Sequence, residues 1–312
     1  MLSPRQLRTR FVAAATAKFA ASVPDFRALQ QLVVDKGGRF LNDHGAIRTA
    51  DAEVCALLLR AARVLGLHRD RSYFFPAKKL VSFDLQATGQ SSGEFKIFVS
   101  QVDLSAFPPE VAAMVGSDAA IQAEHIDHAS FIALIAKAEA SGGLSDPDAE
   151  AFVEHFVLKL MQRNGPPIAR ATLNAVSAVS PEAASALALG PDFNHVTIDV
   201  QAAGFAGIEA MAEEMRQRGF ILLPAIQGAP NTKLRQTATM AATMTTPVLE
   251  ADGSNGSAAS EKQFVEIIER RQAHADDGTP LWTDDGAPLI FKHFLAANAE
   301  KIFDAAATRT GS

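Results

Sequence analysis

The chain has 312 residues, and its 29 Lys and Arg residues against 35 Asp and Glu residues give a net charge of -6. This balance argues against nucleic acid or an anionic membrane as the main partner, because both call for a basic surface. The single cysteine, Cys55, excludes an intramolecular disulfide and a multi-cysteine metal site. No apolar run approaches the roughly 18 residues of a membrane span, and we expect a soluble, cytoplasmic protein.

Residues 1–40 are predicted to form N-terminal helices. Ser3 is placed to cap the first helix with Pro4 at its first position, and Gly37 with Gly38 forms a helix stop. The basic, alanine-rich start is also typical of organelle transit segments, but Pro4 and the scattered arginines fit an ordinary first helix better.

Residues 41–105 predict a first β module. The strand "HGAIRTA" precedes the amphipathic helix "DAEVCALLLRAARVLGL", in which Cys55 is expected to be a small buried side chain and not a nucleophile. Two segments rich in aromatic and branched residues follow as strands, "SYFFPAKKLVSFDLQ" and "EFKIFVSQVDL", with the turn "ATGQSSG" between them.

Residues 106–190 predict a helical insert of four or five helices, because the segment is alanine-rich and is divided by "PPE", "SGGLSDPD", "RNGPP" and "SPE". Residues 192–275 then repeat the earlier order of elements as a second β module. We expect strands at 195–200, 220–226, 235–248 and 263–271, a helix at 204–219 and a loop at 250–262. The tail 280–312 is expected to be helical and to close the chain with a helix.

The two β modules resemble each other in detail. His44 follows "LND" and His195 follows "DFN", and each histidine opens a strand that leads into an amphipathic helix. A Pro-Ala step lies 32 residues after His44 at Pro76, and another lies 29 residues after His195 at Pro224. The repeat predicts an α+β fold of paired β-α-β-β-β modules in one domain, with the two histidines at equivalent positions.

The alternation of side chains along strands predicts which residues share a face. His195, Thr197 and Asp199 point to one side, while Val196, Ile198 and Val200 point to the core. By the same rule, His44 shares a face with Ala46 and Arg48.

A third ligand is available in "QFVEIIERR". Glu266 and Glu269 lie on opposite faces of this strand, so one carboxylate must point to the apolar side, where an unpaired charge is costly and a metal ion makes it favourable. Two imidazoles and one carboxylate on one face are typical of non-haem iron(II) oxygenases, and zinc accepts the same ligands. His125 and His128 also have a spacing that can share a metal, but their charged neighbours favour a solvated helix face.

Together, "NDHGAIRT", "KIFVSQVDLS", "FNHVTIDV", "RQTATM" and "FVEIIERR" resemble the 2-oxoadipate dioxygenase/decarboxylase family, which is related to the vicinal oxygen chelate superfamily. The resemblance spans residues 38 to 305, and "FVEIIERR" is also similar to the ligand-bearing last strand of 4-hydroxyphenylpyruvate dioxygenase. In both comparisons the first acid of the motif is the metal ligand, which favours Glu266 over Glu269.

The resemblance implies a glyoxalase-like half-open barrel with Fe(II) held by His44, His195 and Glu266. It implies that Arg48 binds a substrate carboxylate, and that the enzyme uses O2 to convert a 2-oxo acid, 2-oxoadipate above all, into 2-hydroxyglutarate with release of CO2, a step of lysine catabolism. Gln236, Thr237 and Thr239 are expected to line the pocket. The chain is shorter than the characterised bacterial members, so residues from their extra segments have no counterpart here.

Two other functions remain open at this point. The same ligands could hold Zn2+, Ni2+ or Mn2+ in a glyoxalase-like lyase or isomerase that works without oxygen, or the chain could be a non-catalytic metal-binding or ligand-binding domain. Neither the ion that is loaded nor the oligomeric state follows from the sequence.

Overall fold

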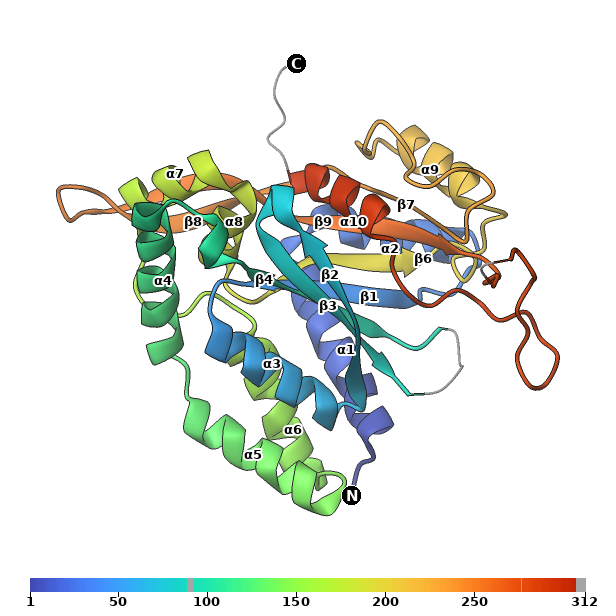
Figure 1. Cartoon of the computed structure of the whole chain (residues 1–312), viewed down its shortest axis with the longest axis horizontal. Coiled ribbons are helices and arrows are strands. Elements are labelled where there is room, and N and C mark those ends of the chain that lie inside the picture. The colour runs from blue at the N-terminus through green and yellow to red at the C-terminus, as the bar shows by residue number, and fades with distance from the viewer. Residues whose placement is uncertain (89–92, 276, 307–312) are drawn as a thin grey trace.

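The computed structural model describes residues 1–88, 93–275 and 277–306, and it is a mixed α+β structure built on an open sheet (Figure 1). In the described part of the chain the strands follow the order β2-β3-β4-β1-β6-β9-β8-β5, and β7 pairs with β9. The two ends of this path do not join, so the sheet stays unclosed. The predicted α+β fold is therefore confirmed.

The N-terminal segment forms two helices, α1 (Pro4–Ser22) and α2 (Pro24–Asp35). The Ser3 side chain accepts the backbone N–H of Gln6, and the Gln6 side chain accepts the backbone N–H of Ser3, which completes a capping box. The chain leaves α2 at Gly37, whose φ of 72° lies in the left-handed region that favours glycine.

The first module has the predicted order. Its elements are β1 (Asn42–Thr49), α3 (Ala52–Val64), β2 (Leu67–Phe75), β3 (Leu80–Ala87) and β4 (Lys96–Val102). Strand β1 pairs with β4 in parallel, and β3 lies antiparallel to both β2 and β4. Cys55 is buried in α3, as predicted. The predicted turn at 87–93 falls mostly on residues 89–92, which lie outside the described residues.

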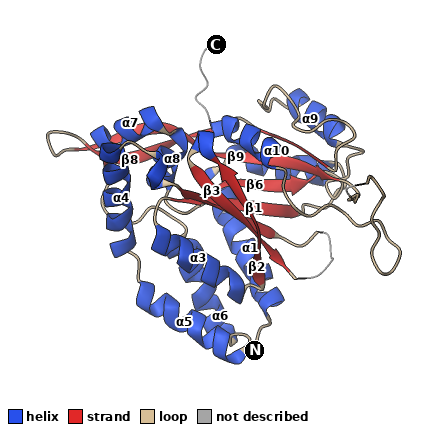
Figure 2. Cartoon of the chain, in the orientation of Figure 1, coloured by secondary structure: helices blue, strands red, loops and turns tan. Residues whose placement is uncertain are grey.

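The insert is helical, as predicted. Its helices are α4 (Pro109–Glu124), α5 (His128–Ser141), α6 (Asp146–Glu154), α7 (Arg170–Val179) and α8 (Pro181–Leu189). A π-helical stretch (His155–Leu160) continues α6, and the two-residue strand β5 (Ile168–Ala169) pairs with β8. Figure 2 shows α3, α5 and α6 together on one side of the strands. Helix α8 instead contacts β1 and β9, which brings the insert to the site described below.

The second module repeats the topology of the first. Its elements are β6 (Phe193–Asp199), α9 (Ile208–Gln217), β7 (Leu234–Ala238), β8 (Ala242–Leu249) and β9 (Asn255–Arg270). Strand β6 pairs with β9 in parallel and β7 lies antiparallel to β9, just as β1, β4 and β3 do in the first module. The modules meet where β1 and β6 pair antiparallel.

Two predictions about this module are wrong. The segment 220–226 is not a strand and makes an isolated bridge only at Leu222, because Pro224 has no N–H to donate to a ladder. The predicted loop at 250–262 is shorter, since β9 already begins at Asn255 and pairs with β8 in a two-stranded arm, seen at the left of Figure 1. Residues 255–262 are small or polar, so the sequence there lacks the hydrophobic alternation that marks a half-buried strand.

The C-terminal segment is helical only from α10 (Ala296–Ile302), which runs into a 3-10 turn (Phe303–Ala306). The tail closes with a helix, as predicted, and residues 288–295 before it are not helical. Arg270 donates to the backbone carbonyls of Phe291 and His293, which therefore need no helical partner. Helix α10 contacts β2 of the first module and β7 of the second, so this helix lies across both modules (Figure 1).

The sheet separates an apolar layer from a face with polar side chains. Val196, Ile198 and Val200 have no exposed surface and pack in the larger core with α1, α2 and α3, as the alternation predicts. Their neighbours His195 and Thr197 point to the opposite side. Among the described helices, none is both long and apolar enough to cross a bilayer.

Candidate metal centre

His44, His195 and Glu266 come together on the polar face of the sheet. His44 on β1 lies opposite Thr197 on β6, and His195 lies opposite Ala46, so the two histidines are related by the pseudo-twofold symmetry of this strand pair. Glu266 on β9 lies beside Thr197 in the parallel pair of β6 and β9. The sequence repeat thus predicted the equivalence of the histidines correctly, and strand pairing adds the carboxylate.

The three side chains present atoms at the separations expected of metal ligands. Nε2 of His195 lies 3.3 Å and Nε2 of His44 lies 3.7 Å from Oε2 of Glu266, and one ligand atom from each residue lies within 4.8 Å of the others. Two ligands about 2.1 Å from a metal and at right angles to each other lie about 3 Å apart. The residues are only 2%, 5% and 1% exposed.

Burial sets the charge state of the group. It lowers the pKa of His195 well below its usual value, an effect that His44 and Arg48 increase. Burial also lowers the pKa of His44, against the opposing effect of Asp43. Both imidazoles are therefore neutral near pH 7 and can act as ligands.

The Glu266 carboxylate is poorly compensated. Burial raises its pKa to about 8, and its Oε1 has no hydrogen-bond partner among the described residues. The hydroxyl of Thr197 donates to Oε2 at 3.1 Å and lies 3.0 Å from Nε2 of His44. A cation would compensate both the carboxylate and its free oxygen. The residues present therefore fit a divalent metal ion.

The cavity beside these three residues is small and mostly apolar. It holds about 20 Å³ and is closed by Gln236 from β7, Phe98 from β4, and residues of the C-terminal segment, namely Phe294, Ala299, Ile302 and Phe303. The sequence did not predict this role of the C-terminal segment. The available signal was the group of large apolar residues in the tail, which were assigned only to a closing helix.

Arg48 lies on the same face of β1 as His44 and is 4% exposed. Its guanidinium carbon lies 5.3 Å from the centre of the Phe303 ring, so Arg48 contacts a residue that lines the cavity but is not itself one of the lining residues. Its Nε has no hydrogen-bond partner among the described residues. Burial lowers the pKa of Arg48, against the opposing effect of Glu182 of α8. Glu182 is itself ion-paired to Lys78 at 3.2 Å.

Of the other residues expected in the pocket, Gln236 lines the cavity. Thr237 alternates with Gln236 along β7, and the hydroxyl of Thr239 accepts the backbone N–H of Val265. Neither threonine is among the residues that line the cavity, so this part of the prediction is wrong. Glu269 is also buried, but it pairs with Arg271 at 3.0 Å and Arg235 at 3.5 Å and so has partners of its own.

Three of the other histidines have partners of their own. His125 and His128 contact backbone carbonyls at the end of α4, as expected of a helix surface. His293 forms a second group with Asp70 and Asp84, in which Nδ1 lies 3.1 Å from Asp70. Asp84 already accepts hydrogen bonds from the hydroxyl of Tyr73, the amide of Gln86 and the backbone of Arg71, so this group is satisfied by protein donors.

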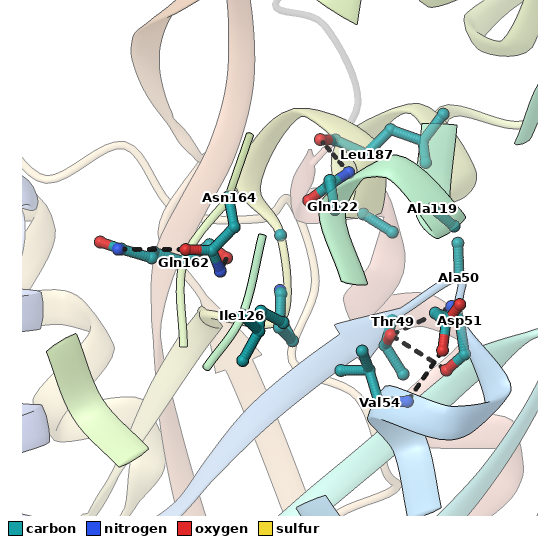
Figure 3. Close-up of a pocket in the computed structure, with 13 residues that line it drawn as sticks. Thr49, Ala50, Asp51, Val54, Ala119, Gln122, Ile126, Gln162, Asn164 and Leu187 are labelled. Atoms are coloured by element: carbon teal, nitrogen blue, oxygen red, sulfur yellow. Dashed lines mark hydrogen bonds between the residues drawn. The ribbon is translucent and has the colours of Figure 1, made fainter. Parts of the chain in front are cut away.

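A separate hollow lies where the end of β1 and the start of α3 meet the insert (Figure 3). Asp51 is the one ionisable residue among those that line it, and its carboxylate caps α3 by accepting the backbone N–H of Val54 at 2.8 Å. Gln122 is likewise bonded to the carbonyl of Leu187. The hydrogen bonds of these polar groups stay within the first module, as at Asp51, or within the insert, as at Gln122.

A family model described as 2-oxoadipate dioxygenase/decarboxylase matches residues 11–285. The chain belongs to this family. Proteins named 2-oxoadipate dioxygenase/decarboxylase from Mycobacterium bovis and Mycobacterium tuberculosis are 24% identical to it over 369 residues, which cover 97% of this chain and 87% of each relative.

Solved structures share the fold. A glyoxalase-superfamily protein from Ralstonia eutropha JMP134 has a TM-score of 0.77 and 21% identity, covering 86% of this chain and 84% of its own. The hydroxyglutarate synthase from Oryza sativa in complex with 2-oxoadipate has a TM-score of 0.69 and 18% identity, covering 96% and 91%. The enzyme from Pseudomonas putida, also with 2-oxoadipate, has a TM-score of 0.71 and 24% identity, covering 88% and 66%. At these identities the likeness concerns the fold alone.

Proposed function

We propose that the protein is an Fe(II)-dependent dioxygenase that decarboxylates 2-oxoadipate and forms 2-hydroxyglutarate. The observation that carries the proposal is the buried group of two neutral imidazoles and one carboxylate on one face of the sheet. Such a facial set leaves three neighbouring coordination positions for substrate and O2. Family membership supports the reaction class, and the bound 2-oxoadipate of the rice and Pseudomonas proteins supports the substrate.

Iron held by His44, His195 and Glu266 would supply the redox chemistry that couples loss of the substrate carboxylate to reduction of O2. The overall reaction balances as one 2-oxoadipate and one O2 giving one 2-hydroxyglutarate and one CO2. The protein's own contribution is to orient the substrate and to exclude water, since the three residues are buried beneath apolar side chains.

Arg48 is proposed to bind the distal carboxylate of the diacid. Four residues along a strand span about 13 Å, and a long arginine side chain that reaches back from position 48 shortens this to the scale of a six-carbon substrate. The guanidinium is buried, and its Nε has no hydrogen-bond partner in the described part of the chain. An incoming carboxylate would supply the missing hydrogen bonds. Glu182 does not take this place, because Lys78 holds it.

The apolar wall of the cavity must move for the substrate to enter. A volume of about 20 Å³ has room for about one water molecule and not for a six-carbon diacid. Phe294 lies in the non-helical segment before α10, and Phe303 lies in the 3-10 turn after it. These parts of the cavity wall lie outside the sheet. Their return would exclude water once the substrate is bound.

The decisive experiment combines metal analysis with oxygen uptake. We expect the protein loaded anaerobically with Fe(II) to consume one O2 and release one CO2 for each 2-oxoadipate, and to act poorly on 2-oxohexanoate, which lacks the distal carboxylate. His195→Ala should bind no iron and show no turnover. His155→Ala is the matched control, because His155 is equally buried but stacks on Phe131 in the insert.

Three results would contradict the proposal. Undiminished turnover by His195→Ala would remove the residue from the site, and turnover under strict anaerobiosis would favour a glyoxalase-like lyase or isomerase with Zn2+, Ni2+ or Mn2+. A purified protein that takes up no metal would favour a non-catalytic binding domain.

A further inference from the structure

Asp43 and His44 are neighbours in a strand, yet their side chains meet. Consecutive residues of a regular strand point to opposite faces, but Nδ1 of His44 lies 2.9 Å from Oδ1 of Asp43. The pairing of β1 with β6 explains this contact. Asn42 pairs with Ile198 and His44 pairs with Thr197, so Asp43 is the extra residue of a β-bulge. The bulge turns the Asp43 carboxylate toward the ring of His44.

Asp43 is held as an anion deep in the protein. Arg270 donates to it with two nitrogens, Nε at 2.6 Å and Nη2 at 2.7 Å, and Lys96 lies 3.2 Å away. Asp43 is only 2% exposed, and the guanidinium of Arg270 and the ammonium of Lys96 compensate its buried charge, so the carboxyl is ionised. An ionised carboxylate can only accept a hydrogen bond.

A neutral imidazole carries a single N–H, so the partner of one ring nitrogen decides the state of the other. Because Asp43 accepts at Nδ1, the proton of His44 lies there and Nε2 keeps its lone pair. Nε2 is the nitrogen that faces Glu266, and it lies 3.0 Å from the hydroxyl of Thr197, whose single proton can be donated to Nε2 or to Glu266. His195 has no comparable device, since its Nδ1 is buried without a hydrogen-bond partner among the described residues and its ring stacks on Phe264 at 4.7 Å.

Arg270 connects the same carboxylate to the segment that closes the cavity. Its Nη1 donates to the carbonyl oxygens of Phe291 at 3.1 Å and His293 at 2.8 Å. The next residue, Phe294, packs edge-on against the His44 ring with 4.8 Å between the ring centres. One guanidinium therefore fixes the group behind His44 and the backbone that places an aromatic ring beside it.

We infer that Asp43 is the positioning residue of the metal centre: presented by the β-bulge and held by Arg270, it fixes His44 as the Nδ1–H tautomer with Nε2 free to bind metal. This inference rests on the proposed function, which makes His44 a ligand. Outer carboxylates of this kind raise the affinity of a metal site by about 10–100-fold.

The test uses Asp43→Asn and the double variant Asp43→Asn/Arg270→Gln. The double variant removes Asp43 together with one of its two cations and so keeps the net charge of the group unchanged, while Lys96 still donates to the carbonyl of Glu94 at 3.3 Å. Asp118→Asn is the matched control, because Asp118 accepts a similar two-nitrogen contact from Arg163, at 2.7 and 2.9 Å, in the helical insert.

Two readouts are needed. Long-range 15N–1H spectra of the histidine rings in the metal-free protein report which nitrogen carries the proton, and anaerobic binding of Fe(II) or Co(II) reports affinity. In the wild type and in Asp118→Asn we expect a protonated Nδ1 and a bare Nε2 at His44. In both Asp43 variants we expect protonation at Nε2 to appear and metal affinity to fall about 10–100-fold.

An Nδ1–H tautomer that persists in the double variant, with metal affinity within twofold of the wild type, would overturn the inference. The two proposals can fail separately. If the wild type takes up no metal, the proposed function falls, while the ring nitrogens of the metal-free protein still decide whether Asp43 sets the tautomer of His44.

Discussion

Replacing Arg48 with methionine is expected to abolish the preference for a diacid without weakening the fold. Methionine has a similar length, is apolar, and fills the space beside Phe303. The substitution removes the charge of a residue that is 4% exposed and whose Nε has no hydrogen-bond partner among the described residues. Replacing a buried charge with an apolar group of similar size is often neutral or stabilising. The free energy of unfolding should therefore stay the same or rise slightly.

The loss of binding follows from the same burial. Removing one partner of a buried, hydrogen-bonded charge pair costs about 2–5 kcal/mol. A middle value of about 3 kcal/mol corresponds to a loss of about 150-fold in kcat/KM for 2-oxoadipate. 2-Oxohexanoate lacks the distal carboxylate that Arg48 is proposed to bind, so activity on it should change little. Arg48→Lys should fall between, because an ammonium cannot make the two-nitrogen contact.

The assay is oxygen uptake with both substrates, together with urea unfolding of each variant. Arg163→Met is the control with the opposite expectation. Arg163 donates two nitrogens to Asp118, so its loss leaves a partly buried carboxylate unpaired and should cost about 3 kcal/mol or more of stability without changing substrate preference. The reasoning is refuted if Arg48→Met keeps its preference for the diacid, or if it unfolds as easily as Arg163→Met.

Three further predictions concern Lys78, Gly45 and Cys55. Lys78→Gln removes the 3.2 Å ion pair of Glu182 and lets this carboxylate compete for the guanidinium of Arg48. The KM for the diacid should therefore rise about tenfold, and an unchanged KM would argue against this competition. Gly45→Ala places a Cβ 2.4 Å from the Phe193 ring, so urea unfolding should show a loss of about 1–3 kcal/mol and metal affinity should fall, whereas wild-type stability would contradict the packing. Burial raises the pKa of the Cys55 thiol to about 11, so only about one thiol in a thousand is ionised at pH 8 and a thiol reagent should react only as fast as the protein opens; rapid labelling of the native protein would contradict this.

Short-range patterns in the sequence determined much of the framework. The capping residue Ser3 marks the start of the first helix because side-chain capping depends only on residues a few positions away. The alternation in "HVTIDV" assigned Val196 to the core and His195 to the opposite face for the same local reason. The repeat of His44 and His195 even gave the symmetry of the two modules.

The sequence was misleading where exposure or long-range partners control the backbone. The first half of β9 consists of small and polar residues without hydrophobic alternation, so the sequence predicts a loop there. In the tail the sequence predicts a closing helix but not where it begins, because the Arg270 side chain, more than 15 residues earlier, donates to two carbonyl groups of residues 288–295. Neither effect can be read from neighbouring residues.

The candidate site itself is divided in the same way. The sequence by itself determined the residue types, two histidines at equivalent strand positions, one carboxylate in an apolar strand and an arginine four residues after the first histidine. Only the tertiary structure decided their surroundings: the bulge that turns Asp43 toward His44, the guanidinium of Arg270 behind it, and the aromatic residues of the tail that close the cavity. The physical reason is that side-chain direction follows from local strand geometry, whereas charge compensation and enclosure depend on segments more than 200 residues apart in the chain.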